Sequence, residues 1–94
     1  MTKEEIIFFL KTNKEKLQKS FNVKKIGLFG SYAKDRATQD SDIDIIVDMP
    51  STFDGYYNLK EYLESAFGKK VDLGLEKNIR AFIKDKIKNE IIYV

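Results

Sequence analysis

The chain opens with hydrophobic residues that recur at helical spacing. Thr2 and Glu5 form a capping-box pattern, in which each end of a Ser/Thr-x-x-Glu segment satisfies a backbone amide of the other. Apolar residues then follow at intervals of four and seven positions, at Ile6, Leu10, Leu17 and Phe21. This spacing predicts one helix over roughly residues 3–20.

Two further helical patterns lie in the second half of the chain. Asp54 is expected to cap the first of them, and Gly68 stands where a helix stop belongs. The apolar stripe between them consists of Tyr56, Leu59, Leu63, Ala66 and Phe67. Asn78 is expected to cap a last helix, whose inward residues are Ile79, Phe82, Ile83 and Ile87.

Strand signals separate these helices. Residues 23–29 place Ile26 and Leu28 on one face and end at Gly30-Ser31, after which a short helical turn is expected through Ala33. Residues 35–41 are polar and typical of a loop, and residues 49–53 are expected to form another loop. Alternating apolar residues predict further strands over residues 42–48 and 71–75, and residues 91–94 are expected to form a short terminal strand.

The order α-β-(turn)-β-α-β-α-β predicts the α/β (α+β) class: a palm-like mixed β-sheet flanked by helices. The 94 residues fit a single domain over 1–94. Hydrophobic residues make up 43% and charged residues 34%, which is typical of a soluble globular chain. No apolar run approaches the ~18 residues that span a bilayer. The N-terminus has acidic residues where a signal peptide would be basic, so we expect a cytoplasmic protein without membrane contact.

The absent residue types narrow the chemistry. The chain has no Cys and no His, which excludes disulfides, thiolate zinc sites, Cys nucleophiles and His general bases. Any catalysis must therefore use carboxylates, hydroxyls, Lys or Arg, with a hard cation where one is needed. The net charge of +2 is too small to indicate nucleic-acid binding.

Two acidic residues share one face of a predicted strand. Asp42 and Asp44 stand two positions apart, while Ile43, Ile45 and Val47 take the opposite face. Carboxylates in one site repel each other, and a divalent ion relieves that repulsion. Mg²⁺ binds oxygen ligands and leaves positions for substrate phosphates. The pair therefore looks like half of a phosphoryl-transfer metal site, although acidic residues that simply face water explain most D-x-D patterns.

Two neighbouring features favour the metal-site interpretation. Gly30-Ser31 ends a strand before a helical turn, an arrangement that exposes amides and a hydroxyl to an anion. Taken alone, the segment is better explained as an ordinary Gly-Ser turn. Asp72 lies on another predicted strand, away from its apolar face. If that strand is next to residues 42–48, Asp72 joins the same surface, where three carboxylates can hold two cations or accept a proton from a hydroxyl.

Charged and aromatic residues elsewhere allow weaker inferences. Lys34 and Arg36 follow the Gly-Ser turn and are candidates for phosphate contacts, or are solvated loop charges. The lysines of the last predicted helix are read as its solvated face. Aromatic residues exceed what one helix face can bury, which leaves a partner surface open, with core packing as the alternative; they include Phe8, Phe9, Tyr56 and Tyr57.

Together these segments resemble a known family signature. Residues 30–34 (GSYAK) and 41–47 (SDIDIIV) are similar to the GSxA(R/K)G…SDxDxxV motif of the minimal nucleotidyltransferases in the DNA polymerase beta superfamily. Val71-Asp72-Leu73 resembles the later strand that bears the third acidic residue. The resemblance spans nearly the whole chain, and the combined motif is far more specific than either half.

The resemblance implies an enzyme that transfers a nucleotidyl group from a nucleoside triphosphate, here ATP, with Mg²⁺, and two ions are expected. It implies metal binding and catalysis by Asp42, Asp44 and Asp72. Nucleotide contacts would come from Gly30, Ser31, Lys34, Arg36 and Ser41. Members this short are similar to the antitoxins of toxin–antitoxin pairs, whose partner is a helical HEPN-domain ribonuclease. Some of these antitoxins transfer AMP to a tyrosine of the toxin.

One position departs from the signature, and other functions remain open. Asp35 replaces the family glycine; Asp tolerates a left-handed backbone, but its charge opposes triphosphate unless it points outward. A non-catalytic module that masks a toxin by contact is the main alternative. A nucleotide-sugar glycosyltransferase and a nucleic-acid binder are weaker ones. Because no acceptor-binding domain is evident, we expect a partner chain or self-association to complete the cleft.

Overall fold

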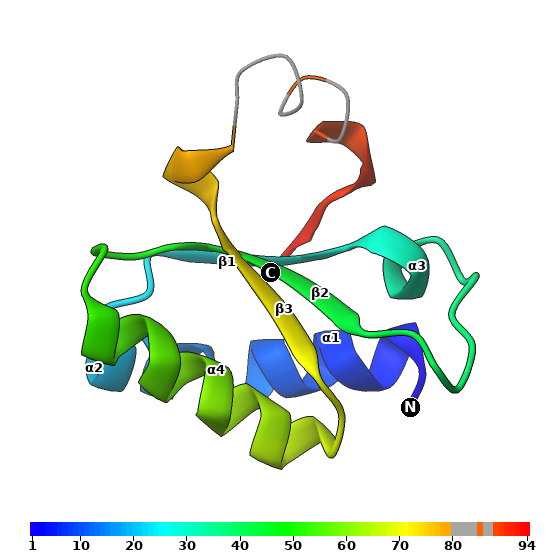
Figure 1. The fold of residues 1–94 in the computed structure, drawn as a ribbon, viewed down its shortest axis with the longest axis horizontal. Helices are drawn as coiled ribbons and strands as arrows, with labels where there is room; N and C mark the ends of the chain where they lie inside the picture. The colour runs from blue at the N-terminus through cyan, green and yellow to red at the C-terminus, as the bar shows by residue number, and fades with distance from the viewer. Residues whose placement is uncertain (80–84, 86–87) are drawn as a thin grey trace.

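The computed structural model describes residues 1–79, 85 and 88–94, which form a four-stranded mixed sheet with helices (Figure 1). The strand order is β3-β2-β1-β4; β2 runs parallel to β3, and β1 runs antiparallel to both β2 and β4. The strands are β1 (Lys25–Phe29), β2 (Ile43–Asp48), β3 (Val71–Leu75) and β4 (Ile92–Tyr93). The helices are α1 (Lys3–Thr12), α2 (Lys14–Phe21), α3 (Gly30–Ala33), α4 (Phe53–Phe67) and the 3₁₀ helices η1 (Glu76–Asn78) and η2 (Lys88–Glu90).

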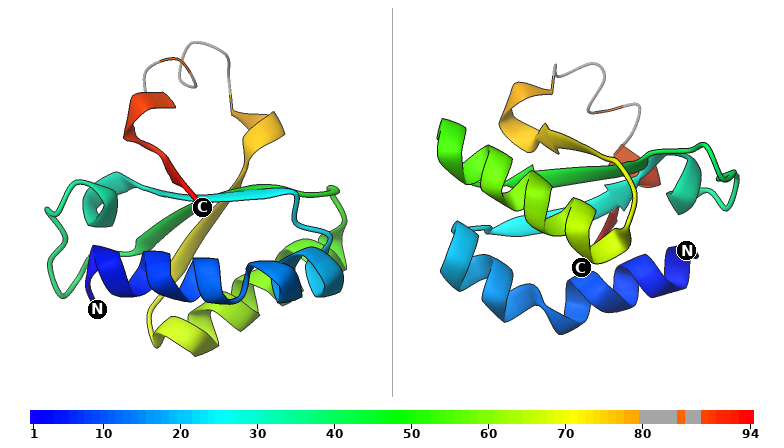
Figure 2. Two further views of the ribbon diagram at one scale, coloured as in Figure 1. Left: turned by 180° about the vertical axis from the view of Figure 1, so that it is seen from behind. Right: turned by 60° about the horizontal axis from the view of Figure 1, so that its bottom comes forward.

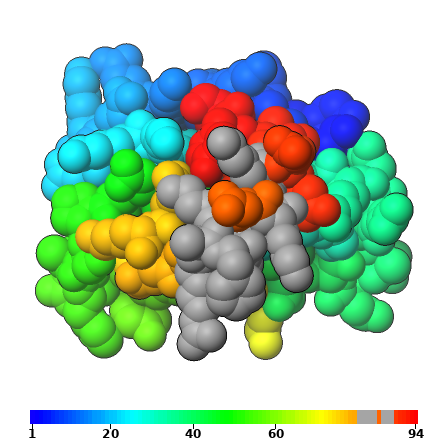
Figure 3. Space-filling view, turned by 90° about the horizontal axis from the view of Figure 1, so that it is seen from above, coloured from blue at the N-terminus to red at the C-terminus, as the bar shows by residue number. Residues whose placement is uncertain are grey.

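The hydrophobic core lies between one face of the sheet and a layer of helices. Helices α1, α2 and α4 all lie on this face, and α3 lies at the end of β1 (Figure 2). Alternation along β2 turns Ile43, Ile45 and Val47 into the core, where each is fully buried. The opposite face carries Asp44 and Asp48 (Figure 3 looks onto it), with η1 and residues 88–94 on either side of its centre. The helices therefore hold the sheet from one side and leave the acidic residues on the other.

Most predicted elements are confirmed, and so is the mixed α/β fold class. The capping box at Thr2 and Glu5 is present, with both reciprocal hydrogen bonds made. The turn after β1 is helix α3, and Gly68 ends α4 in the left-handed conformation at φ +66°. Alternation in β3 buries Val71 and Leu73 and leaves Asp72 exposed.

The prediction of one continuous helix over residues 3–20 is wrong. It is two helices that meet at Asn13, whose backbone angles of φ −101° and ψ 12° are not helical. The Asn13 side-chain amide donates to the Phe9 carbonyl over 2.9 Å, and the Asn13 backbone amide donates to the same oxygen over 3.0 Å. Asn is well suited to such a break because its side chain competes for backbone partners.

The second predicted helix begins earlier than expected. Its cap is Thr52 rather than Asp54, since the Thr52 hydroxyl accepts a hydrogen bond from the Gly55 amide over 3.2 Å. Asp54 lies within the first turn, where a carboxylate also favours the helix. Ala66, placed in the apolar stripe by its spacing, is exposed, because the buried side of α4 follows the four-residue spacing of Leu59, Leu63 and Phe67 and Ala66 lies beside it.

The last predicted helix does not begin at Asn78. Residues 76–78 form the 3₁₀ helix η1 and Ile79 is extended, with φ −80° and ψ 126°. The rest of that prediction, including Phe82, Ile83 and Ile87, lies outside the described residues. No helix in the described part of the chain is long and apolar enough to cross a bilayer.

Candidate functional site

Strand pairing brings two of the predicted acidic residues side by side. Asp44 of β2 is the register partner of Asp72 in the parallel strand β3. On its other side, Asp44 pairs with Phe29, the residue that leads into Gly30. Since paired residues on adjacent strands point to the same face, Asp44 and Asp72 project together from the sheet. The sequence condition for a shared surface, that β3 is next to β2, is therefore met.

Gly30 packs directly against Asp44. A Cβ atom at Gly30 would lie 2.9 Å from the Asp44 Cγ and 3.1 Å from its Cβ, and it would collide with the Asp44 carboxylate oxygen. Gly30 also has φ +76°, a left-handed conformation that favours glycine. Glycine is thus required for two reasons, and the Gly-Ser turn and the acidic residue form one contact.

The environment of Asp44 makes its charge unfavourable. Burial, the largest cause, acts together with repulsion by Asp72 and Asp42 and with a hydrogen bond that protonated Asp44 donates to Asp72, and these raise the pKa of Asp44 from 3.8 to about 6. Asp42 and Asp72 are themselves exposed. A cation beside these three carboxylates would remove the repulsion and restore the charged form of Asp44.

The donor set fits a hard cation. The available ligands are carboxylate oxygens, in a chain with no Cys and no His, and oxygen ligands suit Mg²⁺. Among residues 1–79, 85 and 88–94, no three acidic side chains are gathered closely enough to hold an ion by themselves. A cation here would therefore take its remaining ligands from water and from substrate phosphates, as Mg²⁺ commonly does.

The departure from the family motif at Asp35 is accommodated. Asp35 takes the left-handed conformation expected of the glycine it replaces, with φ +57°. Its carboxylate accepts a hydrogen bond from the Lys3 ammonium over 2.9 Å, across 32 residues of sequence. The Asp35 side chain is 63% exposed. The structure thus turns this charge toward α1 and solvent.

The other residues predicted to contact the nucleotide differ in their exposure and in the partners that they already have. Ser31 follows Gly30 at the start of α3, and its carbonyl accepts the Arg36 amide over 2.8 Å. Lys34 forms an ion pair with Glu90 at 3.2 Å, so its charge is already partnered. Arg36 is exposed. The Ser41 hydroxyl accepts the Thr38 amide over 2.9 Å, so Ser41 helps to hold the loop before β2.

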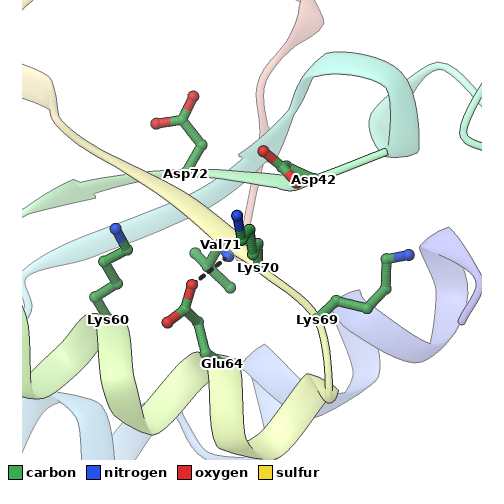
Figure 4. Close-up of a pocket in the computed structure, with 7 residues that line it drawn as sticks. All are labelled: Asp42, Lys60, Glu64, Lys69, Lys70, Val71 and Asp72. Carbon is green, nitrogen blue, oxygen red and sulfur yellow. Dashed lines mark hydrogen bonds between the residues drawn. The ribbon is translucent and has the colours of Figure 1, made fainter. Parts of the chain in front are cut away.

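A group of residues that the sequence analysis did not single out borders the acidic site. An open groove is lined by Lys60 and Glu64 of α4, by residues 69–72 and by Asp42 (Figure 4). The Glu64 carboxylate accepts the Val71 amide over 2.9 Å. The signal available in the sequence was the pair Lys69-Lys70 directly before Val71-Asp72, but Lys60 reaches the groove only through the packing of α4.

Comparisons with known proteins agree with this geometry. The model of the nucleotidyltransferase domain family matches residues 9–94. The protein adenylyltransferase MntA of Thermococcus cleftensis is 39% identical over 97 aligned positions, which cover 100% of this chain and 97% of that protein.

Solved structures of toxin–antitoxin complexes are also similar. One, a toxin–antitoxin with AMP-PNP, superimposes with a TM-score of 0.69 at 27% identity, covering 87% of this chain and 69% of the other. Another, of tri-AMPylated Shewanella oneidensis HEPN toxin with an MNT antitoxin, gives a TM-score of 0.60 at 26% identity, covering 87% of this chain and 66% of the other. Both similarities cover most of the present chain.

Proposed function

The chain belongs to the nucleotidyltransferase domain family, and from that premise we propose that it transfers AMP from ATP to a tyrosine hydroxyl of a HEPN-domain toxin, which it thereby neutralises. The observation that carries the proposal is the contact of Gly30 with Asp44, beside Asp72. It joins the turn suited to phosphates and the carboxylates suited to a cation in one site. The AMP-PNP complex and the AMPylated HEPN toxin among similar structures support the nucleotide and the partner.

The reaction is attack of the acceptor hydroxyl oxygen on the α-phosphate of ATP, with pyrophosphate as the leaving group. Asp42, Asp44 and Asp72 would hold Mg²⁺, two ions in the full arrangement. Bound Mg²⁺ supplies neutralisation of the charge on the phosphates and polarisation of the reacting phosphoryl group. Asp72, which is exposed on the edge strand β3, would accept the proton of the acceptor hydroxyl.

The turn after β1 would bind the triphosphate. Gly30 allows close backbone approach, and Ser31, Lys34 and Arg36 supply donors and positive charge. Lys34 must leave Glu90 to reach a phosphate, because the two side chains form an ion pair. Ser41 contributes by fixing the loop that leads to Asp42.

The test is transfer of label from α-labelled ATP to a HEPN-domain partner protein. The double variant D42N/D44N should abolish transfer while the fold persists. The matched control is D48N, which removes a carboxylate from the same strand and face, farther along β2. Undiminished transfer by D42N/D44N, or an equal loss in D48N, would refute the assignment of the site.

A non-catalytic antitoxin is the second candidate function. Two observations favour it: Lys34 is paired with Glu90, and the described acidic residues do not form a closed metal site. In that case the chain neutralises the toxin by contact alone. Full neutralisation by D42N/D44N, together with no label transfer by the wild-type protein, would favour this function over catalysis.

A further inference from the structure

The groove beside Asp72 lies on the side of the acidic site opposite the Gly-Ser turn. In the sheet order β3-β2-β1, the turn follows β1, Asp44 lies on β2 and Asp72 on β3. The groove continues from Asp72 toward α4, with Lys60 and Glu64 rising toward it (Figure 4). Nucleotide site, carboxylates and groove therefore follow one another across the sheet.

This order matches the geometry of the proposed reaction. In a phosphoryl-transfer displacement the attacking oxygen and the leaving oxygen lie roughly in line on opposite sides of the phosphorus. If pyrophosphate leaves toward the Gly30 turn, the acceptor must approach from the side of Asp72. The groove is the hollow that opens on that side.

The charged side chains of the groove differ in whether they already have a hydrogen-bond or ion-pair partner. The Glu64 carboxylate is held by the Val71 amide, and Lys69 donates to the Gln39 carbonyl over 2.8 Å. Lys60 and Lys70 make no ion pair with any described residue. The groove thus holds two lysines that have no acidic partner in the described part of the chain, next to the position where the acceptor would react.

At two positions on the outer edge of β3, backbone groups are already hydrogen-bonded within the chain and are not available to a partner strand. The Val71 amide donates to Glu64, and the Leu73 carbonyl accepts the Tyr56 hydroxyl over 2.6 Å. An acceptor that enters here is therefore recognised through side chains rather than by strand addition.

We propose that this groove docks the acceptor polypeptide, and that Lys60 and Lys70 select acidic residues flanking the acceptor tyrosine. The inference rests on the proposed adenylyl transfer. In that step the tyrosine oxygen forms a bond to the α-phosphorus, the bond from the α-phosphorus to the oxygen that bridges it to the β-phosphorus breaks, pyrophosphate leaves, and the phenolic proton passes to the Asp72 carboxylate. The lysines take no part in the bond changes; they hold and orient the acceptor.

The experiment compares two fluorescent peptides that share one central tyrosine, flanked by glutamates in one and by lysines in the other. Both are assayed for label transfer from α-labelled ATP and, with Mg²⁺ and a non-hydrolysable ATP analogue, for binding by fluorescence anisotropy. The variant is K60E/K70E. The control K11E/K14E makes the same charge change at exposed positions of α1 and α2. Thermal unfolding of all proteins checks that the fold persists.

For the wild-type protein and K11E/K14E we expect preference for the glutamate peptide. In K60E/K70E the KM for that peptide should rise roughly tenfold, the preference should shift toward the lysine peptide, and the KM for ATP should stay unchanged. Equal use of both peptides by the wild-type protein, an unchanged preference in K60E/K70E, or tighter binding of a single-stranded RNA than of the glutamate peptide would overturn the inference.

Failure of the proposed function is recognised separately. If no peptide or partner protein receives label, adenylyl transfer itself is refuted, and the anisotropy data still decide about the groove. Glutamate-peptide binding that is weakened only by K60E/K70E supports docking there, and binding that is equal in all three proteins refutes it.

Discussion

The charge of Asp44 should destabilise the metal-free protein at neutral pH, and D44N should relieve this. Burial and the neighbouring Asp72 and Asp42 raise the pKa of Asp44 from 3.8 to about 6 in the folded state. At ~1.4 kcal/mol per pH unit, the gap corresponds to at most ~3 kcal/mol. Asp44 is only partly buried, so solvent screening reduces the expected effect to ~1 kcal/mol.

The sign of the effect follows from the direction of the pKa change. Below about pH 4 the Asp44 carboxyl is protonated in both the folded and the unfolded state, and the penalty is absent. As the pH rises from about 4 to about 6, the unfolded chain releases the Asp44 proton while the folded protein keeps it, and stability is lost. Above that pH the penalty is complete. D44N carries no such charge, so its advantage should appear between pH 4 and 6 and then remain constant.

The assay is urea unfolding of the wild-type protein, D44N and D48N in EDTA from pH 4 to pH 8. Taking differences between proteins cancels the titration of the other groups. D44N should be more stable than wild type by ~1 kcal/mol at pH 7.5, equivalent to ~4–8 °C in Tm for a domain of this size, and D48N should not follow this pattern. Mg²⁺ should stabilise the wild-type protein more than D44N. A D44N difference that does not vary with pH would refute the reasoning.

Three further predictions concern the turn and its neighbours. In urea unfolding, G30A should lower the free energy of unfolding by ~2–3 kcal/mol, because the added Cβ collides with Asp44 at a residue with positive φ. The control G68A also has a positive φ, +66°, but open space around it, so it should lower the free energy of unfolding by only ~1 kcal/mol. K3Q should raise the KM for ATP about threefold to fivefold by releasing the Asp35 carboxylate, and K3Q/D35G should restore it; an equal defect in both variants would contradict this role of Lys3. E90Q should lower the KM for ATP about threefold, measured by initial rates, because Lys34 then needs no release; an unchanged KM would place Lys34 outside the nucleotide site.

The sequence alone was sufficient to predict the structural features that depend on residues close together along the chain. The two-residue period of β2 set which face carries Asp44, and this face is the one opposite the buried Ile43, Ile45 and Val47. Gly68 and the Thr2 capping box depend on a few adjacent residues and were also predictable. By contrast, apolar spacing continued past Asn13 without interruption, so periodicity alone gave one helix where a side-chain-to-backbone bond makes two.

Features made by distant segments were beyond such reasoning. Asp44 and Asp72 are neighbours because β3 pairs with β2 in one particular register. The sequence alone did not reveal this pairing, so their shared surface could be predicted only on the condition that the two strands are adjacent. Lys60 enters the groove because α4 packs beside β3, and no spacing along the chain reveals that. The ion pair of Lys3 with Asp35 joins segments 32 residues apart, so the charge at Asp35 looked more unfavourable in the sequence than it is in the fold.

The contact between Gly30 and Asp44 has a consequence for how substrates bind. The turn that would receive the triphosphate lies against the Asp44 carboxylate, whose charged form burial and Asp72 disfavour. A cation makes that charged form favourable, and a triphosphate brings both cation and phosphate oxygens to the same place. If the chain binds Mg²⁺ and ATP here as proposed, each ligand improves the site for the other, and the two affinities would be linked reciprocally. Two short motifs that are weak when taken separately lie in contact in the folded chain, because the sheet register and one glycine bring them together.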